Sequence, residues 1–447
     1  LWHDGERHKA MHCMRLLLDK HGGDSTAGDE LYGWQEHFAS SAGPISPDVG
    51  LSAKAWRRFG EWQEQMPIEG AAATADSDLI AAELYASLKH YRAAAKLDPK
   101  SYKAWHSLAL VHFGVVQGAT QELVEEAEGS SAESKRAALR AHIVPAITCF
   151  FRSIALGAAS QRSLQDILRL LTLWFQHGGD AELGVNAAIV KGLEGTPVDT
   201  WLSVIPQLIA RIGNPSKDIR DAVCDLLIRL GSAHPQGLCF PLTVASHSHV
   251  GATQVLDAMR RQYDTLVQQA HLVASELIRT AALWSEQWQE ALTEASALYF
   301  GSGDVDGMIA TLEPYHKMMQ NAPQTLAEVT FEQSFGRQLE LAWSRVKRYQ
   351  QSGEEADINS AWEVYKQCYG RITAKNRALS RLELAYVSPA LHAARDLELA
   401  VPGTYRPGVP FTRIRSFARS MTVIVSKQRP RIMSMHGDDG AEHRFLL

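Results

Sequence analysis

Apolar residues between positions 281 and 375 recur every three to four residues, in four segments of about a dozen residues or more, separated by short breaks. This spacing is typical of amphipathic helices, which turn one apolar side toward a common core. In the first segment Leu292, Ser296 and Phe300 are four residues apart and therefore lie on one side of the helix. The second segment covers about residues 305–320.

The third and fourth segments complete the set. The third runs over about residues 325–352, with a bend, and Gly353 supplies a stop signal. The fourth begins near Asp357 and carries one stripe of residues at helical spacing: Asn359, Trp362, Lys366 and Tyr369. Four antiparallel helices with short connections predict a small bundle that buries its own core.

Residues 1–280 are also mostly helical in pattern, and part of this region shows a repeat. Tyr91, Ala94 and Pro99 fit the last half of a tetratricopeptide-type unit. The first helix of the next unit would carry Trp105, Leu108, Ala109 and His112. A plain helical hairpin accounts for the same residues about as well. From 143 to 278, turns containing Gly or Pro recur roughly every 20 residues, which favours paired helices stacked into an α-solenoid.

Two stretches depart from this pattern. Residues 117–140 are rich in Gln, Glu, Ala, Ser and Lys, and we expect an exposed, partly disordered insertion there. A further helical stretch is expected at about 380–395, before apolar runs at 414–425 and 432–447. Two strands joined by an Asp-Gly turn are the interpretation of these runs, and no other part of the chain reads as β. The predicted fold is mainly α, with TPR/HEAT-like helical pairs, a four-helix bundle and terminal strands.

Charge is distributed unevenly along the chain. The formal net charge of the 447 residues is -5. Residues 376–447 contain 11 Lys and Arg against 6 Asp and Glu, a balance of +5, which leaves -10 for residues 1–375. This charge has three interpretations: the basic tail binds phosphates, it contacts the acidic remainder of the molecule, or it is ordinary solvated surface. We expect no nucleic-acid partner.

The five cysteines are far apart and mostly stand in apolar helical segments: Cys13, Cys149, Cys224, Cys239 and Cys368. This pattern predicts reduced, buried thiols, and none has the spacing of a zinc site. We find no signal peptide and no apolar run approaching the length of a membrane span. We therefore expect a cytoplasmic protein, with endomembrane surfaces or the nucleus as further locations. Because the chain lacks an initiator Met and ends within a strand-like pattern, we expect it to be a fragment.

Several longer motifs follow one another in a fixed order. The bundle contains Leu283-Trp284-x3-Trp288, Glu294-Ala295-Ser296-x-Leu298-Tyr299-Phe300, Pro323-Gln324-Thr325-Leu326 and Ala361-Trp362-x2-Tyr365. Upstream stand Phe150-Phe151-Arg152-Ser153-Ile154, Leu170-Leu171-Thr172-Leu173-Trp174-Phe175, the run 204–212 and the run 240–246. Downstream are the run 396–405 and Ser426-Lys427-Gln428-Arg429-Pro430-Arg431. Together these motifs resemble the target-of-rapamycin kinases, with strong similarity over roughly residues 100–447 and loose similarity before that.

The resemblance implies three consecutive parts. Residues 1–279 would form a solenoid of FAT helical repeats that includes the polar insertion at 117–140. Residues 280–375 would form the rapamycin-binding four-helix bundle. Residues 376–447 would contain a linker helix and the truncated beginning of a kinase small lobe.

The resemblance also implies a docking face on the bundle, made of eight residues: Leu292, Ser296, Phe300, Asn359, Trp362, Glu363, Lys366 and Tyr369. By periodicity alone, ordinary bundle core is the better reading of the apolar members. Asn359 stands where the family usually has a small hydroxyl residue, Lys366 where it has an aromatic residue, and Tyr369 where it has Phe. An ammonium group beside an apolar macrolide costs desolvation unless it turns outward. We therefore expect retained substrate docking and reduced affinity for rapamycin presented by an immunophilin.

The segment 426–431 resembles the nucleotide-covering loop of these kinases. The resemblance places Ser426 and Gln428 over the phosphates of ATP, with Mg²⁺, and Leu446 in the adenine pocket. On residue chemistry alone this segment is a solvated basic hairpin. No catalytic loop or DFG motif is present, so we assign no catalytic residue and no metal ligand and expect this chain alone to be inactive.

The resemblance thus implies a parent serine/threonine kinase whose bundle docks protein substrates and which joins other subunits of a TOR-type complex. One alternative is a helical-repeat scaffold or adaptor without kinase activity, against which the β pattern after residue 414 argues. Another is a different large kinase with FAT repeats, which would lack the inserted bundle and its paired tryptophans.

Overall fold

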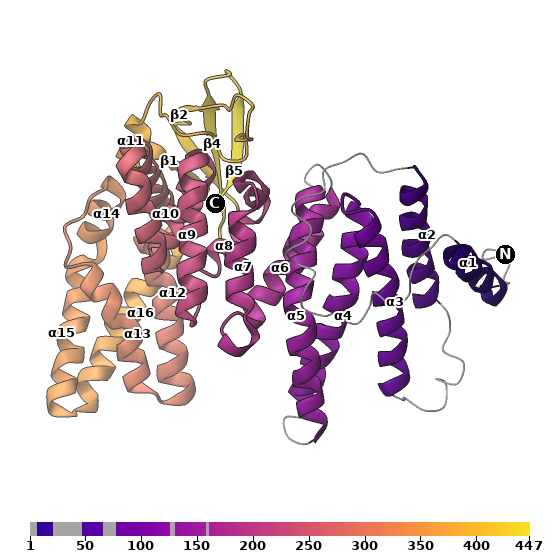
Figure 1. Ribbon diagram of the computed structural model, residues 1–447. Coiled ribbons are helices and arrows are strands. Elements are labelled where there is room, and N and C mark those ends of the chain that lie inside the picture. Colours follow the sequence, from indigo (N-terminus) through magenta and orange to yellow (C-terminus); the bar gives the residue numbers. More distant parts are fainter. Residues whose placement is uncertain (1–6, 21–46, 66–76, 126–129, 158–160) are drawn as a thin grey trace. The chain divides into compact units, whose positions relative to one another are not determined.

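The computed structural model describes residues 7–20, 47–65, 77–125, 130–157 and 161–447. The chain divides into two compact units, Leu1–Arg229 and Leu230–Leu447. Helices dominate both units, and the strands found among the described residues all belong to the second (Figure 1). The predicted mainly α fold is confirmed.

The first unit is a series of helices that pack against their neighbours in sequence. They are α1 (Arg7–Lys20), α2 (Pro47–Glu64), α3 (Ser77–Leu97), α4 (Tyr102–Glu125), α5 (Ser130–Leu156), α6 (Gln161–His177), α7 (Val185–Glu194), α8 (Ile205–Ile209) and α9 (Lys217–Ala233), which runs into the second unit. The most extensive contacts join α2 to α3 and α4 to α5. Stacked helical pairs are the arrangement that a solenoid requires.

The residues of the predicted repeat lie between α3 and α4. Tyr91 and Ala94 on α3 are buried, as are Trp105 and Leu108 on α4. The indole Nε1 of Trp105 donates a hydrogen bond to the carbonyl of Pro99 over 2.9 Å, which ties α4 to the turn before it. These positions are therefore packing positions of a helical pair.

The polar segment 117–140 contains the end of one helix and the start of the next. Helix α4 continues to Glu125 and α5 begins at Ser130, while residues 126–129 lie outside the described part. Lys135 Nζ lies 3.5 Å from Glu122 Oε2, so the two helices remain paired here. The described residues of this segment are helical, 117–125 in α4 and 130–140 in α5, and the expectation of partial disorder stays a prediction.

Helix α5 corrects a second expectation. Its segment Ala132–Leu156 is long and apolar enough to cross a membrane by length and composition, although we expect no run of that length from the sequence. Of its most apolar window, 56% is buried inside the structure. Because the core helix of a soluble protein passes the same test, this is weak evidence for a membrane span.

The second unit begins with α10 (Pro235–Ser246) and α11 (Val250–Ala281), which is kinked at Tyr263. Four helical arms follow: α12 (Trp284–Ala297), α13 (Val305–Met318), α14 (Leu326–Phe331) continued by α15 (Arg337–Ser352), and α16 (Glu355–Arg377). A π-helical turn at Glu332–Gly336 joins α14 to α15 and accounts for the predicted bend. Gly353 ends α15 with a φ of 73°, a left-handed conformation that glycine adopts at little cost. The predicted four-helix bundle is confirmed.

The bundle core is aromatic around one buried histidine. Tyr365 and Trp288 are fully buried, and His316 Nε2 lies 2.9 Å from the hydroxyl of Tyr365. The imidazole stacks on Trp343 with ring centroids 4.4 Å apart. Burial, and secondarily the charge of Lys347, lowers the pKa of His316 to about 3, so this ring is neutral near pH 7.

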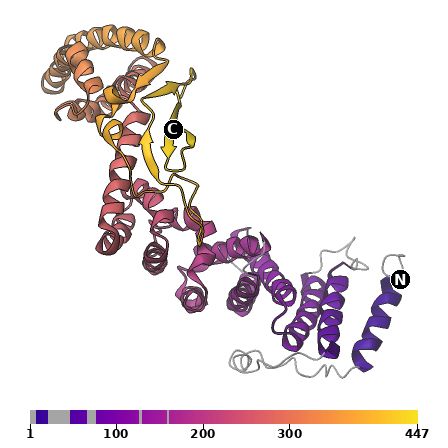
Figure 2. The same cartoon turned by 90° about the horizontal axis from the view of Figure 1, so that it is seen from above.

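A small antiparallel sheet completes the second unit. Its strands are β1 (Arg381–Glu383), β2 (Ile414–Phe417), β3 (Ser420–Val423), β4 (Arg431–Gly437) and β5 (Glu442–Leu446). Their order is β1-β3-β4-β2, with β5 also paired to β4. Figure 2 shows the strands after residue 413, in yellow, beside the helices of the same unit.

The sequence reading of this region is wrong in two respects. Four strands, rather than two, lie after residue 413, and β1 lies inside the stretch expected to be helical. β1 is a strand because Leu382 pairs with Met421 on β3, a distant partner that local pattern does not reveal. The rest of that stretch forms two short helices, α17 (Leu384–Val387) and α18 (Pro389–Ala393).

Candidate functional site

An aromatic face lies where the end of α12 meets α16. Phe300 is 68% exposed, and its ring centroid lies 5.5 Å from that of Trp362, which is 8% exposed. The ring of Tyr299 lies 5.6 Å from Trp362 and 4.9 Å from Phe300. Below them, Tyr365 contacts Trp362 with ring centroids 5.8 Å apart. The exposed ring therefore rests on a packed aromatic base. We call Phe300, Tyr299 and Trp362 the aromatic face.

The backbone explains why Phe300 points outward. Helix α12 ends in a π-helical turn, Leu298–Ser302, and the N–H of Gly303 donates to the carbonyl of Leu298. Phe300 stands in this terminal turn, beyond the last residue of α12, where it is 68% exposed, whereas Leu292 lies in the middle of α12 and is 2% exposed. Gly303 (φ 68°) ends the turn, and the side chain of Asp304 accepts from Gly307 N to begin α13.

The structure separates the eight predicted face residues into three groups. Leu292 is 2% exposed and belongs to the bundle core, and Trp362 forms the base of the face. Ser296 and Tyr369 are half-buried at its edge. The exposed members are Phe300, Asn359, Glu363 and Lys366. The predicted grouping of Phe300 with Trp362 corresponds to a contact, whereas Leu292 lies beneath the surface.

Two polar contacts fix the edges of the face. The hydroxyl of Tyr299 donates to Asn359 Oδ1 over 2.7 Å, which joins α12 to α16. The hydroxyls of Thr293 and Tyr369 lie 3.4 Å apart. Burial raises the pKa of Tyr299, and Glu355 adds to this, so the phenol remains a neutral donor. Sequence reasoning missed Tyr299 as a site residue, although it stands beside Phe300 in the motif.

One further feature of the face is a polar atom without a partner. The indole Nε1 of Trp362 is buried and makes no hydrogen bond within the described part of the chain. Burying an unpaired donor costs free energy.

A separate cavity of about 300 Å³ lies at the other end of the bundle. Its wall is apolar at Trp284, Phe331 and Leu382, and basic at Arg279 and Lys375. Arg279 is already paired with Glu276, with N and O 3.4 Å apart, and donates to Gln324. None of the residues predicted for docking lines this cavity.

The predicted nucleotide loop connects β3 to β4. Ser426 and Gln428 are exposed on it, and Ser426 Oγ accepts from Arg429 N over 3.1 Å. Leu446 is 66% exposed on β5 and pairs with Ile432 on β4, itself 37% exposed. Directly paired residues share one face of a sheet, so these two side chains form an exposed apolar pair. The structure thus provides polar groups on the loop and an apolar surface on the adjoining strands.

Comparison with known families identifies two of the chain's parts. The FKBP12-rapamycin binding domain family matches residues 276–374, and the FAT domain family matches residues 1–172. The first match covers all four arms of the bundle except the last three residues of α16. The second extends through the first hundred residues, where the sequence alone shows only loose similarity.

Curated relatives match over nearly the whole chain. The serine/threonine-protein kinase mTor of Drosophila melanogaster is 41% identical over 415 residues, which is 90% of this chain and 16% of that protein. The serine/threonine-protein kinase tor1 of Schizosaccharomyces pombe is 40% identical over 446 residues, which is 96% of this chain and 18% of that protein. The serine/threonine-protein kinase Smg1 of Drosophila melanogaster is 26% identical over 325 residues, which is 63% of this chain and 10% of that protein. The chain therefore spans less than a fifth of the length of these relatives.

Proposed function

Because the chain belongs to the target-of-rapamycin family, we propose that it is the framing and substrate-docking part of an ATP-dependent serine/threonine protein kinase. The relatives with 40% and 41% identity are named serine/threonine kinases, and both match at least 90% of this chain. The lower identity and coverage of Smg1 favour the target-of-rapamycin kinases over other large kinases with FAT repeats. No observation favours a scaffold without kinase activity.

The single observation that carries the docking proposal is the contact between Phe300 and Trp362. An exposed aromatic ring on a rigid aromatic base offers a large contact area at little entropic cost. The face belongs to the bundle that the FKBP12-rapamycin binding domain family matches. We propose that protein substrates, and rapamycin presented by an immunophilin, bind here.

Three residues reduce the proposed affinity for rapamycin. Asn359 is bulkier than the hydroxyl residue that the family resemblance implies, and its side chain is held by Tyr299. Lys366 is exposed and supplies a charge in place of an aromatic ring. Tyr369 adds a hydroxyl to the edge of the face. Since an apolar ligand gains little beside hydrated polar groups, we propose docking weaker than the nanomolar range.

We propose that Ser426, Gln428 and Leu446 contact ATP. The exposed pair Leu446 and Ile432 fits an apolar base, and the hydroxyl of Ser426, which accepts from Arg429 N, keeps its hydrogen for a phosphate oxygen. Bound with Mg²⁺, ATP supplies the transferable γ-phosphoryl group. The residues of this chain would hold the nucleotide and cover its phosphates.

Domain limits, partners and location belong to the same proposal. We assign the solenoid to 1–279, the bundle to 280–375 and the start of the small lobe to 376–447. Further subunits of a TOR-type complex would bind the helical solenoid, whose paired helices offer long surfaces. We propose a cytoplasmic location, including endomembrane surfaces or the nucleus.

The test is phosphoryl transfer by the intact protein that contains this chain. With ATP, Mg²⁺ and a protein substrate, it should phosphorylate Ser or Thr residues, whereas residues 1–447 alone should not. Replacing Phe300 by Ala in the intact protein should lower kcat/KM for the protein substrate and leave KM for ATP unchanged. Absence of transfer by the intact protein refutes the kinase proposal, and an unchanged kcat/KM refutes the docking proposal.

A further inference from the structure

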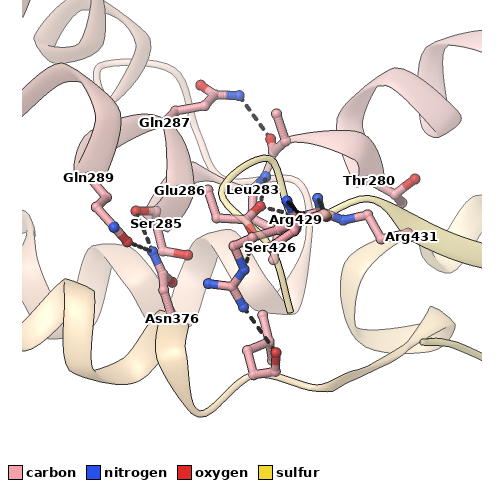
Figure 3. Close-up of polar contacts among 12 residues, drawn as sticks. Thr280, Leu283, Ser285, Glu286, Gln287, Gln289, Asn376, Ser426, Arg429 and Arg431 are labelled. Carbon is pink, nitrogen blue, oxygen red and sulfur yellow. Dashed lines mark hydrogen bonds and ion pairs between the residues drawn. The ribbon is translucent and has the colours of Figure 1, made fainter. Parts of the chain in front are cut away.

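A single carboxylate on the bundle holds the loop between β3 and β4. Glu286, in the first turn of α12, pairs with Arg431 at the start of β4, and its Oε1 lies 3.4 Å from Arg429 Nε (Figure 3). The side chain of Arg431 is only 2% exposed, that of Glu286 14% and that of Arg429 17%. These three residues are therefore a largely buried ionic cluster between the bundle and the sheet, and we call them the loop clamp.

The loop is attached at further points through the same arginines. Arg429 donates from its guanidinium to the carbonyl of Leu379 over 2.9 Å, just beyond α16. Arg431 donates to the carbonyl of Arg429 over 2.8 Å. The N–H of Arg429 donates to Ser426 Oγ over 3.1 Å. A chain of polar contacts thus runs from Glu286 to Ser426, which we propose as a phosphate contact.

The backbone of the loop depends on these side chains. Arg429 has a φ of 51°, in the left-handed region that residues other than glycine adopt at a cost. Such a conformation persists only where the surroundings hold it. Here the holding contacts are the pairing with Glu286, the bond to the carbonyl of Leu379 and the bond to Ser426. Without Glu286, the loop loses the attachment that both arginines share.

The bundle side of the clamp is also fixed. Glu286 accepts a hydrogen bond from Leu283 N over 3.1 Å, which caps the start of α12. Asn376, near the end of α16, donates to the carbonyl of Ser285 over 3.0 Å and to Gln289 Oε1 over 2.8 Å. The first turn of α12 is therefore joined to α16 as well as to the loop, as Figure 3 shows.

A second glutamate shows what capping alone requires. Glu328 occupies the same position in α14, where it accepts from Gln324 N over 2.7 Å and from Thr325 N over 3.3 Å. It is 8% exposed, and it makes no ion pair with a described arginine or lysine. Capping therefore does not need the two arginines, and their convergence on Glu286 points to another purpose.

We propose that Glu286 is a positioning residue for the nucleotide-covering loop, so that the helical bundle sets the conformation in which Ser426 meets ATP. This inference rests on the proposed function of the loop. Its physical basis is that one buried and one largely buried guanidinium group need a carboxylate, and this carboxylate belongs to the bundle rather than to the sheet. Helix α12 carries Glu286 in its first turn and leads into Phe300 at its far end. A change at the aromatic face that moved α12 would therefore reach the loop.

The test replaces Glu286 by Gln in the intact protein, with Glu328→Gln as the matched control. Gln still offers an oxygen to cap the helix but removes the charge that the arginines share. We expect KM for ATP to rise by about tenfold in Glu286→Gln, with kcat within about twofold of wild type, because the loop would spend less time in its binding conformation. We also expect faster amide hydrogen exchange over residues 424–430. Glu328→Gln should change neither quantity.

A second variant is a control in case Glu286→Gln fails to fold. Arg429→Gln breaks the pairing from the loop side and leaves the cap of α12 intact, so it should reproduce the rise in KM. The inference is overturned if both variants keep the wild-type KM and the wild-type exchange over 424–430. If wild type itself shows no ATP-dependent transfer, the proposed function fails, and with it the role in nucleotide binding. The exchange rates would then show separately whether Glu286 holds the loop.

Discussion

Substituting Phe300 and substituting Leu292 should affect docking and stability in opposite ways. Phe300 is 68% exposed, so only about a third of its side chain is buried. Full burial of such a side chain contributes about 1.5–3 kcal/mol, and Phe300→Ala should therefore lower the free energy of unfolding by about 0.5–1 kcal/mol. Leu292 is 2% exposed, and Leu292→Ala should lower it by about 2–5 kcal/mol because it leaves a cavity in the bundle core.

The affinity of docking should fall more in Phe300→Ala than in Leu292→Ala. Loss of a central aromatic anchor at an interface costs about 2 kcal/mol, so Phe300→Ala should weaken binding of an FKBP12–rapamycin complex by about thirtyfold. Leu292→Ala should bind nearly as wild type at temperatures where it is folded. Urea unfolding followed by tryptophan fluorescence gives the stabilities, and calorimetric titration of the chain 1–447 gives the affinities. The reasoning is refuted if Phe300→Ala binds like wild type, or if it unfolds as easily as Leu292→Ala.

Two further predictions concern the face and the core below it. Lys366→Phe should strengthen binding of the FKBP12–rapamycin complex by about tenfold, because it replaces a hydrated ammonium with an aromatic surface. If the variant and the wild type bind the complex with equal affinity in the same titration, Lys366 does not limit docking. His316 has its pKa lowered from 6.5 to about 3, so the unfolded chain binds the proton first and stability falls as the pH drops through this window. At pH 4.5 the free energy of unfolding should be roughly 2–3 kcal/mol lower than at pH 7.5 because of this residue. His316→Gln should flatten that part of the urea-unfolding profile, and a profile parallel to wild type would contradict the neutral imidazole.

The bundle was predictable because its signals are local. Helical spacing, the bend before residue 337 and the left-handed glycine at 353 are all determined by residues close in sequence. Strand β1 was not predictable in this way. Its three residues have a helical pattern, and they become a strand only through pairing with β3, forty residues later.

The candidate site shows the same limit at the level of single residues. Spacing of four placed Leu292 and Phe300 on one side of an ideal helix, but Leu292 is 2% exposed in the middle of α12 and Phe300 is 68% exposed in the π-helical turn Leu298–Ser302 at its end. Spacing within a helix does not show which of its residues the neighbouring helices cover. The pairing of Glu286 with Arg429 and Arg431 joins positions more than 140 residues apart. A glutamate three residues after a helix start signals a cap, but it carries no information about a distant arginine.

The central claim, that the aromatic face is the docking surface, is tested most directly by mapping where a ligand binds. Hydrogen exchange of the chain 1–447, with and without a saturating FKBP12–rapamycin complex, would locate the contact. We predict protection of residues 292–302 and 355–370, and none at the cavity lined by Arg279 and Lys375. Protection at that cavity without protection of the aromatic face, or no protection at all, would contradict the account.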